Sequence, residues 1–289
     1  MVYLKSMTFP NADREHDFIM SIRRTCYESF YPFKILSRND LYRLDFNPIT
    51  ILYGGNGSGK STVLNVIAEK LQIPRDTIFN KTIFFNDYVK LCDVNLEQKI
   101  PDSSKIITSD DVFDYMLNIR SMNEKIDAKR DEITAEYLDA KYSNFQLRSI
   151  EDYEQLKKVN NARHKTQSKY INDSLMKNMR ELSNGESALF YFTQKIYDKG
   201  LYLLDEPENS LEPKKQLELV QYLEDSARFF ECQFIISTHS PFLLAMQHAS
   251  IYNLDREPVE VEQWTELENV RTYYEFFKKH EDKFSLPIP

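Results

Sequence analysis

Glycine is scarce in this chain of 289 residues and is concentrated in one short segment. The whole sequence contains six glycines, and four of them lie between positions 54 and 59. A chain of this length and average composition would contain roughly twenty. Because glycine is needed where a backbone takes unusual dihedral angles or approaches another group closely, residues 54–59 are the first candidate for a functional loop.

This segment matches a phosphate-binding pattern. Residues 54–61 read GGNGSGKS, which fits G-x-x-x-x-G-K-[ST]. Such a loop points backbone N–H groups and a helix N-terminus at a triphosphate. The pattern predicts that Lys60 reaches the β- and γ-phosphates and that the Ser61 hydroxyl ligates Mg²⁺. The predicted ATP-binding residues here are Gly54, Asn56, Gly57, Ser58, Gly59, Lys60, Ser61 and Thr62.

The flanking sequence is typical of the elements that hold a phosphate loop. Residues 49–53 form a short apolar, β-branched run, which predicts a buried parallel strand. Residues 61–71 have apolar side chains at helical spacing, and Pro74 follows them. A chance glycine-rich turn would not be expected between such elements, so the sequence favours a nucleotide site.

A second apolar run, residues 201–204, delivers two acids at its end. Asp205 and Glu206 follow it directly, and the carboxyl end of a parallel strand is where α/β sheets bind ligands. We predict that Asp205 supports Mg²⁺, directly or through water, and that Glu206 orients or deprotonates the attacking water. A solvated acidic turn is the alternative, and the upstream phosphate loop disfavours it.

Two further segments carry candidate residues. Residues 182–187 read LSNGES, so Ser183 is a candidate helix cap and Gly185 a site of close approach. Such a helix N-terminus can bind an anion, although an ordinary capped helix explains these residues equally well. His239 follows the apolar run 230–237 and precedes Pro241, which predicts that it lies at the phosphate edge of the sheet.

The order of the predicted elements indicates an α/β fold. Strands alternate with helices along the chain, and shorter strands are predicted at residues 3–9, at an edge, and at 82–85 and 105–108. Residues 111–181 are rich in Lys, Glu, Asp and Asn and contain no glycine. Because they show no sustained heptads, exposed helices are favoured over a dimerising coiled coil.

In their order, the motifs GGNGSGKST, LSNGES, LYLLDEPENSL and IISTHSP resemble Walker A, the ABC signature, Walker B with its D-loop, and the switch histidine. The set resembles ABC-type ATPases of the SMC and RecF class. More narrowly, the chain is similar to bacterial stand-alone "predicted ATPase" or "AAA family ATPase" proteins, which share a YPF-containing N-terminal segment and a THSPxLL motif. The resemblance covers nearly the whole chain and is weakest across residues 111–181.

The resemblance implies a P-loop NTPase with an ABC-ATPase-like head. It implies a mostly parallel central sheet, an N-terminal antiparallel β part and an inserted helical lobe. Residues 1–289 would form a single ABC-type ATPase domain, and residues 111–181 would form the lobe, inserted before the signature. The implied cofactors are ATP and Mg²⁺, and the implied reaction is hydrolysis of ATP to ADP and phosphate.

The resemblance also implies a head-to-tail homodimer with two ATP molecules between the subunits. Lys60, Ser61 and Thr62 of one copy would hold the phosphates and Mg²⁺. Ser183 and Gly185 of the other copy would cap the γ-phosphate. Hydrolysis removes the γ-phosphate, and its loss would loosen the dimer, as in other nucleotide switches.

The resemblance assigns the remaining site residues as well. Asp205 would support Mg²⁺, Glu206 would be the general base, and His239 would contact the γ-phosphate. Residues 209–211 would form the D-loop that crosses between the two sites.

Two expected features of the family are missing from the sequence. No Q-loop glutamine follows a clear strand between the phosphate loop and the signature, and Asp110 occupies the nearest equivalent place. Asp110 is therefore a third candidate ligand for the metal. No aromatic residue is clearly placed to stack on adenine, and Tyr31 and Phe33 are the candidates.

The composition limits the partners and the location of the protein. With 37 Lys and Arg against 45 Asp and Glu, the formal charge is −8, which argues against a surface that binds nucleic acid everywhere. We expect no membrane insertion, no secretion signal and a cytoplasmic location. The three cysteines are far apart, which fits buried thiols in a reducing compartment.

Three functions remain open from the sequence. An ATPase switch with a DNA-related, repair or defence role is favoured, together with an unidentified protein partner. The alternatives are the nucleotide-binding subunit of a membrane transporter and a non-hydrolysing, ATP-gated interaction module. DNA binding is predicted to be weak and non-specific at most. Its candidate basic residues are Arg23, Arg24, Arg38, Arg43, Lys157, Lys158, Arg163, Lys165 and Lys169.

Overall fold

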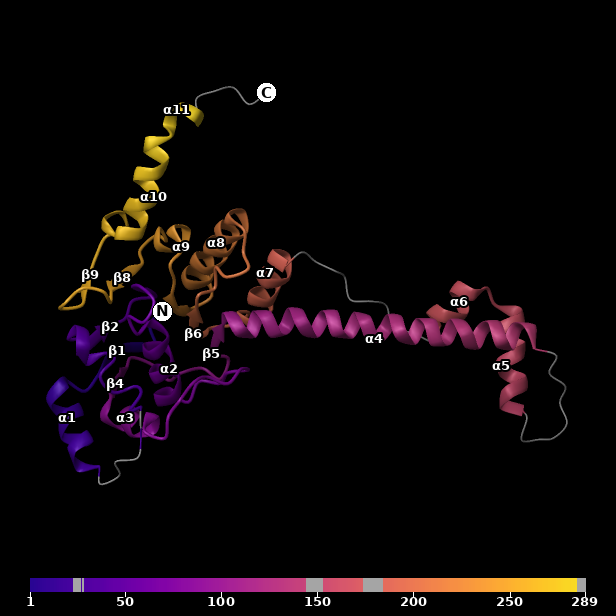
Figure 1. Ribbon diagram of the computed structural model, residues 1–289, viewed down its shortest axis with the longest axis horizontal. Coiled ribbons are helices and arrows are strands. Elements are labelled where there is room, and N and C mark those ends of the chain that lie inside the picture. The colour runs from indigo at the N-terminus through magenta and orange to yellow at the C-terminus, as the bar shows by residue number, and fades with distance from the viewer. Residues whose placement is uncertain (23–26, 28, 144–152, 174–183, 285–289) are drawn as a thin grey trace. The chain divides into compact units, whose positions relative to one another are not determined.

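A computed structural model describes residues 1–22, 27, 29–143, 153–173 and 184–284 (Figure 1). The chain falls into two compact units, which are described separately below. The first unit comprises residues 1–112 and 184–289, and the second comprises residues 113–183.

A six-stranded sheet is the centre of the first unit. Its strand order is β5-β6-β7-β3-β8-β9. The first five of these strands run parallel, and β9 pairs antiparallel with β8. This arrangement confirms the predicted mostly parallel α/β fold. The strands are β3 (Ile49–Tyr53), β5 (Lys105–Thr108), β6 (Gly200–Asp205), β7 (Cys232–Ser237), β8 (Ser250–Asn253) and β9 (Glu260–Val261).

An antiparallel sheet of three strands lies in the N-terminal part of the chain, as predicted. Its order is β2-β1-β4, with β1 (Leu4–Thr8), β2 (Arg43–Asp45) and β4 (Asp93–Leu96). The prediction that β1 is an edge strand was wrong, because β2 and β4 pair with it on both sides. The Gln233 side chain ties β1 to β7, since its Oε1 accepts the backbone N–H groups of Tyr3 and Leu4 at 2.8 and 2.9 Å.

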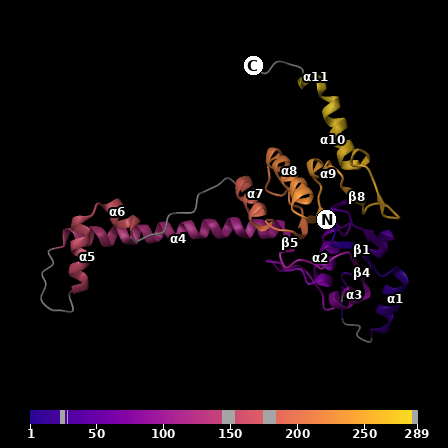
Figure 2. The ribbon, with the colours of Figure 1, turned by 180° about the vertical axis from the view of Figure 1, so that it is seen from behind.

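Helices pack around both sheets, and Figures 1 and 2 show α1 and α3 beside the antiparallel strands. The predicted strand at residues 82–85 is wrong, because Phe85 begins α3 and places itself and Tyr88 on one buried helix face. The helices of this unit include α1 (Ala12–Ser21), η1 (Ser37–Asn39), α2 (Lys60–Leu71), α3 (Phe85–Leu91), α7 (Asn184–Lys195), α8 (Pro213–Phe229), α9 (Pro241–Leu244), η3 (Trp264–Glu266), α10 (Glu268–Lys279) and α11 (Glu281–Phe284).

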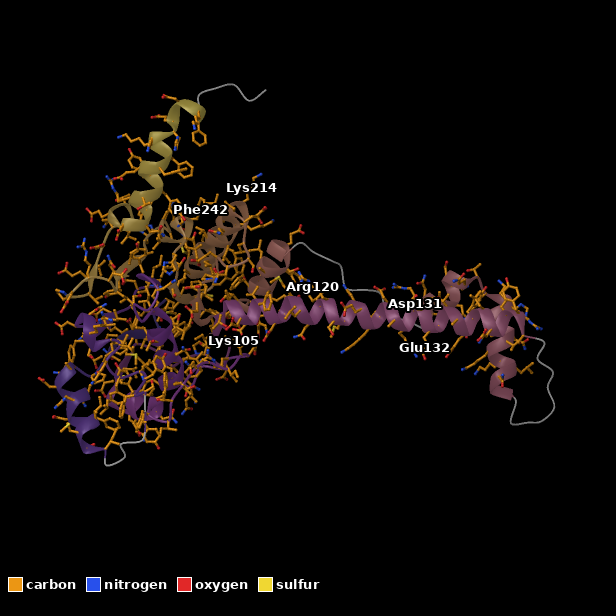
Figure 3. The ribbon with its side chains drawn as sticks, viewed as in Figure 1. Lys105, Arg120, Asp131, Glu132, Lys214 and Phe242 are labelled. Atoms are coloured by element: carbon orange, nitrogen blue, oxygen red, sulfur yellow. The ribbon has the colours of Figure 1, made fainter. Side chains whose placement is uncertain are left out.

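The described part of the second unit is helical, as its composition predicted. Helix α4 (Ser109–Tyr142) starts in the first unit, and α5 (Tyr153–His164) and α6 (Gln167–Asn172) follow. Tyr137 is buried and packs its ring 5.3 Å from that of Tyr170. Side chains of both charges line α4, as Arg120, Asp131 and Glu132 show in Figure 3.

No helix within the described ranges is both long enough and apolar enough to cross a membrane.

Candidate functional site

The candidate residues gather because three neighbouring strands end together. In the parallel register, Leu52 of β3 and Asp205 of β6 both pair with Ser237 of β7. The segments that follow these strands therefore leave the sheet at one edge. They carry Lys60, Glu206 and His239, as the sequence predicted.

Lys60 is buried at the first position of α2. Its Nζ donates to the carbonyl oxygens of Gly54 and Gly55, at 2.7 and 3.2 Å. Burial lowers the pKa of Lys60, while the charges of Glu206 and Asp205 act in the opposite direction. The partly desolvated Lys60 ammonium is therefore held against the backbone of the phosphate loop.

The other residues of the loop differ in exposure. Gly54, Gly59 and Thr62 are buried, Ser58 is half-buried, and Asn56, Gly57 and Ser61 are exposed. The exposed positions form the tip of the loop and the start of α2.

Ser61 and Asp205 meet across the sheet edge. The Ser61 hydroxyl donates to Asp205 Oδ1 at 3.1 Å. Burial raises the pKa of Asp205, although the hydrogen bond from Ser61 opposes that shift. A hydroxyl and a carboxylate are hard oxygen donors of the kind that Mg²⁺ prefers. The donor set therefore fits the predicted metal.

Glu206 and His239 face each other beside that pair. Glu206 Oε1 lies 3.8 Å from His239 Nε2, which is too long for a hydrogen bond. Asn209 Nδ2 donates to the other oxygen, Glu206 Oε2, at 3.0 Å. His239 Nε2 is buried and has no hydrogen-bond partner among the described residues. The two groups are therefore close enough to contact the same bound molecule.

Asp110, the third candidate metal ligand, is not brought into this arrangement. It is exposed in the first turn of α4, and no hydrogen bond within the described chain joins it to Ser61 or Asp205. Its neighbour Asp111 is buried instead, and accepts the backbone N–H of Thr108 at 2.7 Å.

The two aromatic candidates for adenine differ. The prediction that Phe33 stacks on adenine was wrong, because its side chain is 3% exposed and its ring stacks on Phe18 with centroids 4.7 Å apart. Its face is therefore occupied by the core. Tyr31 is brought to the phosphate loop, since its hydroxyl lies 3.1 Å from Thr62 Oγ1.

The signature segment is described in part. Ser183 lies outside the described residues. Gly185 is in the first turn of α7, and a side chain at its position would lie 3.6 Å from the carbonyl oxygen of Ser210, in the turn after β6.

Two acidic residues of the site were missed by sequence reasoning. Glu208 Oε1 accepts the Thr238 hydroxyl and the backbone N–H of His239, both at 2.7 Å. Asp255 Oδ2 accepts the backbone N–H of Gly55 at 2.6 Å. For Asp255 a signal lay in the strand order, because Asp255 follows β8, and β8 runs parallel beside β3, the strand before the phosphate loop.

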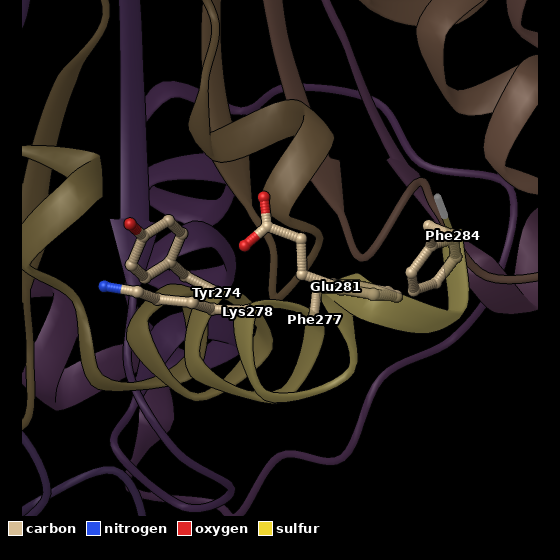
Figure 4. Close-up of a pocket in the computed structure, with 5 residues that line it drawn as sticks. All are labelled: Tyr274, Phe277, Lys278, Glu281 and Phe284. Carbon is tan, nitrogen blue, oxygen red and sulfur yellow. The ribbon is translucent and has the colours of Figure 1, made fainter. Parts of the chain in front are cut away.

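A cavity of about 680 Å³ opens beside these catalytic candidates. Glu206, Glu208 and His239 line one side of it. Phe242 of α9, labelled in Figure 3, and aromatic residues of α10 are among its other lining residues. A smaller cavity of about 420 Å³ lies further along α10 (Figure 4). Tyr274 and Phe277 contribute to both cavities.

The sequence matches two known protein families. Residues 41–209 match the sequence family described as "ABC transporter". Residues 178–245 match the family described as "AAA domain, putative AbiEii toxin, Type IV TA system". No curated protein matches the chain. The narrower resemblance to stand-alone bacterial ATPases stays a prediction.

Solved structures of two kinds are similar to the chain. One is the Smc head domain with an extended coiled coil, bound to the C-terminal domain of ScpA, from Pyrococcus furiosus. It is 14% identical with a TM-score of 0.44, over 97% of this chain and 100% of that one. The other is a dimeric bacterial ABC transporter cassette, 16% identical with a TM-score of 0.38, over 77% of this chain and 88% of that one.

Proposed function

The chain belongs to the ABC transporter sequence family, and we propose that it is an ATPase that hydrolyses Mg-ATP between two copies of itself. One observation carries the proposal. Lys60, the Ser61–Asp205 pair and the Glu206–His239 pair lie together at one edge of the parallel sheet. Each pair has the chemistry that one part of phosphoryl transfer to water requires.

Binding of the triphosphate would use the loop and the helix that follows it. Backbone N–H groups of residues 54–61 and the N-terminus of α2 supply partial positive charge. The Lys60 ammonium adds a full charge at the same place. When bound, Mg²⁺ would be held by Ser61 and Asp205 and would neutralise charge on the phosphate oxygens.

Hydrolysis would depend on Glu206 and His239. Asn209 holds one oxygen of the Glu206 carboxylate, which leaves Oε1 to accept a proton from the attacking water. The imidazole of His239 would donate from Nε2 to a γ-phosphate oxygen. Glu206 would thus act on the attacking water, and His239 would act on the γ-phosphate.

The second copy would complete the site. Ser183 and Gly185 of the partner would cap the γ-phosphate, so that ATP joins the two subunits and its hydrolysis separates them. We propose further that residues 1–289 form one ATPase domain, with residues 111–181 inserted before the signature. The match of residues 178–245 to a family whose description names a toxin system supports a defence-related role.

A second candidate function is the nucleotide-binding subunit of a transporter. The description of the family that matches residues 41–209 favours it. Recovery of a membrane protein bound to the tagged chain from a detergent extract would support this role over the stand-alone switch.

The mass and turnover of Glu206→Gln test the main proposal. We expect turnover to fall by about 10²-fold or more, the scale of a lost general base, with ATP binding retained. With Mg-ATP, light scattering should show a shift from one chain of 34.3 kDa to twice that mass. Lys60→Ala is the control, and should lose both nucleotide binding and the shift.

Two outcomes would contradict parts of this proposal. Near-normal turnover in Glu206→Gln would mean that another group is the base. A mass that stays at one chain, in a variant shown to bind ATP, would contradict the homodimer.

A further inference from the structure

Glu208 lies in the turn after β6, two residues beyond Glu206. Its Oε1 accepts three hydrogen bonds from consecutive residues of the loop after β7. The donors are the Thr238 hydroxyl at 2.7 Å, the His239 backbone N–H at 2.7 Å and the Ser240 backbone N–H at 3.1 Å. One carboxylate oxygen therefore binds all three residues of the loop 238–240, which we call the switch loop.

The His239 peptide is also held from its other side. Asn269, at the start of α10, donates from Nδ2 to the His239 carbonyl oxygen at 2.8 Å. The Asn269 backbone N–H in turn donates to the Tyr53 hydroxyl at 3.2 Å. Because both the N–H and the C=O of His239 are bonded, its imidazole can change position only through its own side-chain torsions.

The same turn also places the general base. The Glu206 backbone N–H donates to the Ser237 carbonyl oxygen at 2.9 Å, and the Asn209 backbone N–H donates to the Glu206 carbonyl oxygen at 3.1 Å. The 3.8 Å between Glu206 Oε1 and His239 Nε2 is therefore set by one short segment that bonds to both residues.

A purely stabilising role would explain Glu208 poorly. Its second oxygen, Oε2, is buried without a hydrogen-bond partner among the described residues. Burial raises the pKa of Glu208, although hydrogen bonds from His239 and Thr238 oppose the shift. Burying a carboxylate costs free energy that apolar residues would not cost, so the gain is expected in geometry.

We propose that Glu208 is the positioning residue of this ATPase: it holds the switch loop so that the His239 imidazole stays beside Glu206, with both groups next to the reacting phosphate. The inference rests on the proposed ATPase function. In this proposal, Glu208 acts on the reaction through His239. Asn269 completes the same support from α10.

The proposal is tested with Glu208→Ala, Glu208→Gln and the matched control Glu224→Ala. Glu224 lies in α8 and also accepts a backbone N–H, that of Gln247, at 2.7 Å. Each variant is examined for kcat and KM with Mg-ATP. The imidazole resonances of protein with isotope-labelled histidine are recorded without nucleotide, and the resonance of His239 is assigned through His239→Gln.

We expect Glu208→Ala to lower kcat by about 10²-fold, the scale of an ångström-level misplacement, with KM changed much less. The His239 resonance should shift or broaden while the other histidine resonances stay in place. Glu208→Gln keeps an acceptor oxygen. Its kcat and its His239 resonance should therefore lie between those of the wild type and those of Glu208→Ala. Glu224→Ala should leave both unchanged.

The readouts separate this proposal from the proposed function. An unmoved His239 resonance with near-normal kcat in Glu208→Ala would overturn the positioning role while the wild-type turnover stands. A wild type without turnover would refute the ATPase, and the resonances would still decide whether Glu208 positions His239. If Glu208→Ala does not fold, Glu208→Gln and Asn269→Ala give the same test.

Discussion

Replacing Gly54 by alanine tests how tightly the phosphate loop is packed. Gly54 has a φ of 156°, and a Cβ there would lie 2.6 Å from Ser58 Oγ and 2.8 Å from Ser58 Cβ. Gly57, in the same loop, has a φ of 86° and no atom within 4 Å of its Cβ position. Both positions have a positive φ that residues other than glycine rarely adopt, and only Gly54→Ala adds a collision.

The magnitudes follow from these contacts. For Gly57→Ala, a left-handed φ costs about 1–2 kcal/mol, and reduced freedom of the unfolded chain returns about 0.4–1 kcal/mol. The net loss of unfolding free energy should be about 1 kcal/mol. For Gly54→Ala, overpacking adds about 1–3 kcal/mol. We therefore expect a loss of about 3 kcal/mol for Gly54→Ala.

Urea denaturation of both variants, without nucleotide, gives the difference directly. A third variant, Ser58→Gly, removes both colliding atoms and allows a double-mutant cycle with Gly54→Ala. The cycle should return a favourable coupling of about 1–2 kcal/mol. Equal unfolding free energies for Gly54→Ala and Gly57→Ala, with zero coupling, would refute the predicted collision. Titration with a fluorescent ATP analogue should show the weaker binding in Gly54→Ala.

Two other predictions concern charge. Burial raises the pKa of Asp205, so the folded protein binds a proton more tightly than the unfolded chain does. The stability of the wild type relative to Asp205→Asn should therefore be greatest below about pH 4 and decline as the pH rises through the raised pKa; urea midpoints that show no such trend would contradict this. Arg43 and Lys165 are paired with Asp45 and Asp173, so binding of duplex DNA should be weak and should decrease as the salt concentration rises. Binding that is equal at low and high salt would exclude an electrostatic mode.

Much of the fold and part of the site could be predicted because their signals are local. The phosphate loop is one continuous segment, and the apolar runs before Gly54, Asp205 and His239 each mark a buried strand. Parallel strands place their carboxyl ends at one edge of the sheet. The order of these apolar runs was therefore enough to predict that the residues following them lie close together. No pairing of distant side chains had to be known.

The residues that were missed depend on contacts between distant parts of the chain. Glu208 bonds to a loop 30 residues away, and Asp255 bonds to the phosphate loop 200 residues away. Phe33 was wrongly predicted as a site residue for the same reason, because its stacking on Phe18 depends on how α1 packs. The motif around Phe33 marks an aromatic segment, but burial decides which aromatic face stays accessible, and burial belongs to the tertiary structure.

The acidic turn shows why sequence alone could not assign each carboxylate. Asp205, Glu206 and Glu208 lie within four positions, and like charges so close would repel one another on a solvated turn. The structure sends them in three directions: Asp205 to Ser61, Glu206 to the cavity beside His239, and Glu208 to the switch loop. Within this turn Glu206 has a left-handed backbone, with a φ of 49°, which a residue other than glycine adopts at a cost. A solvated turn would not need that conformation, so the strain at Glu206 favours a functional arrangement of the three acids.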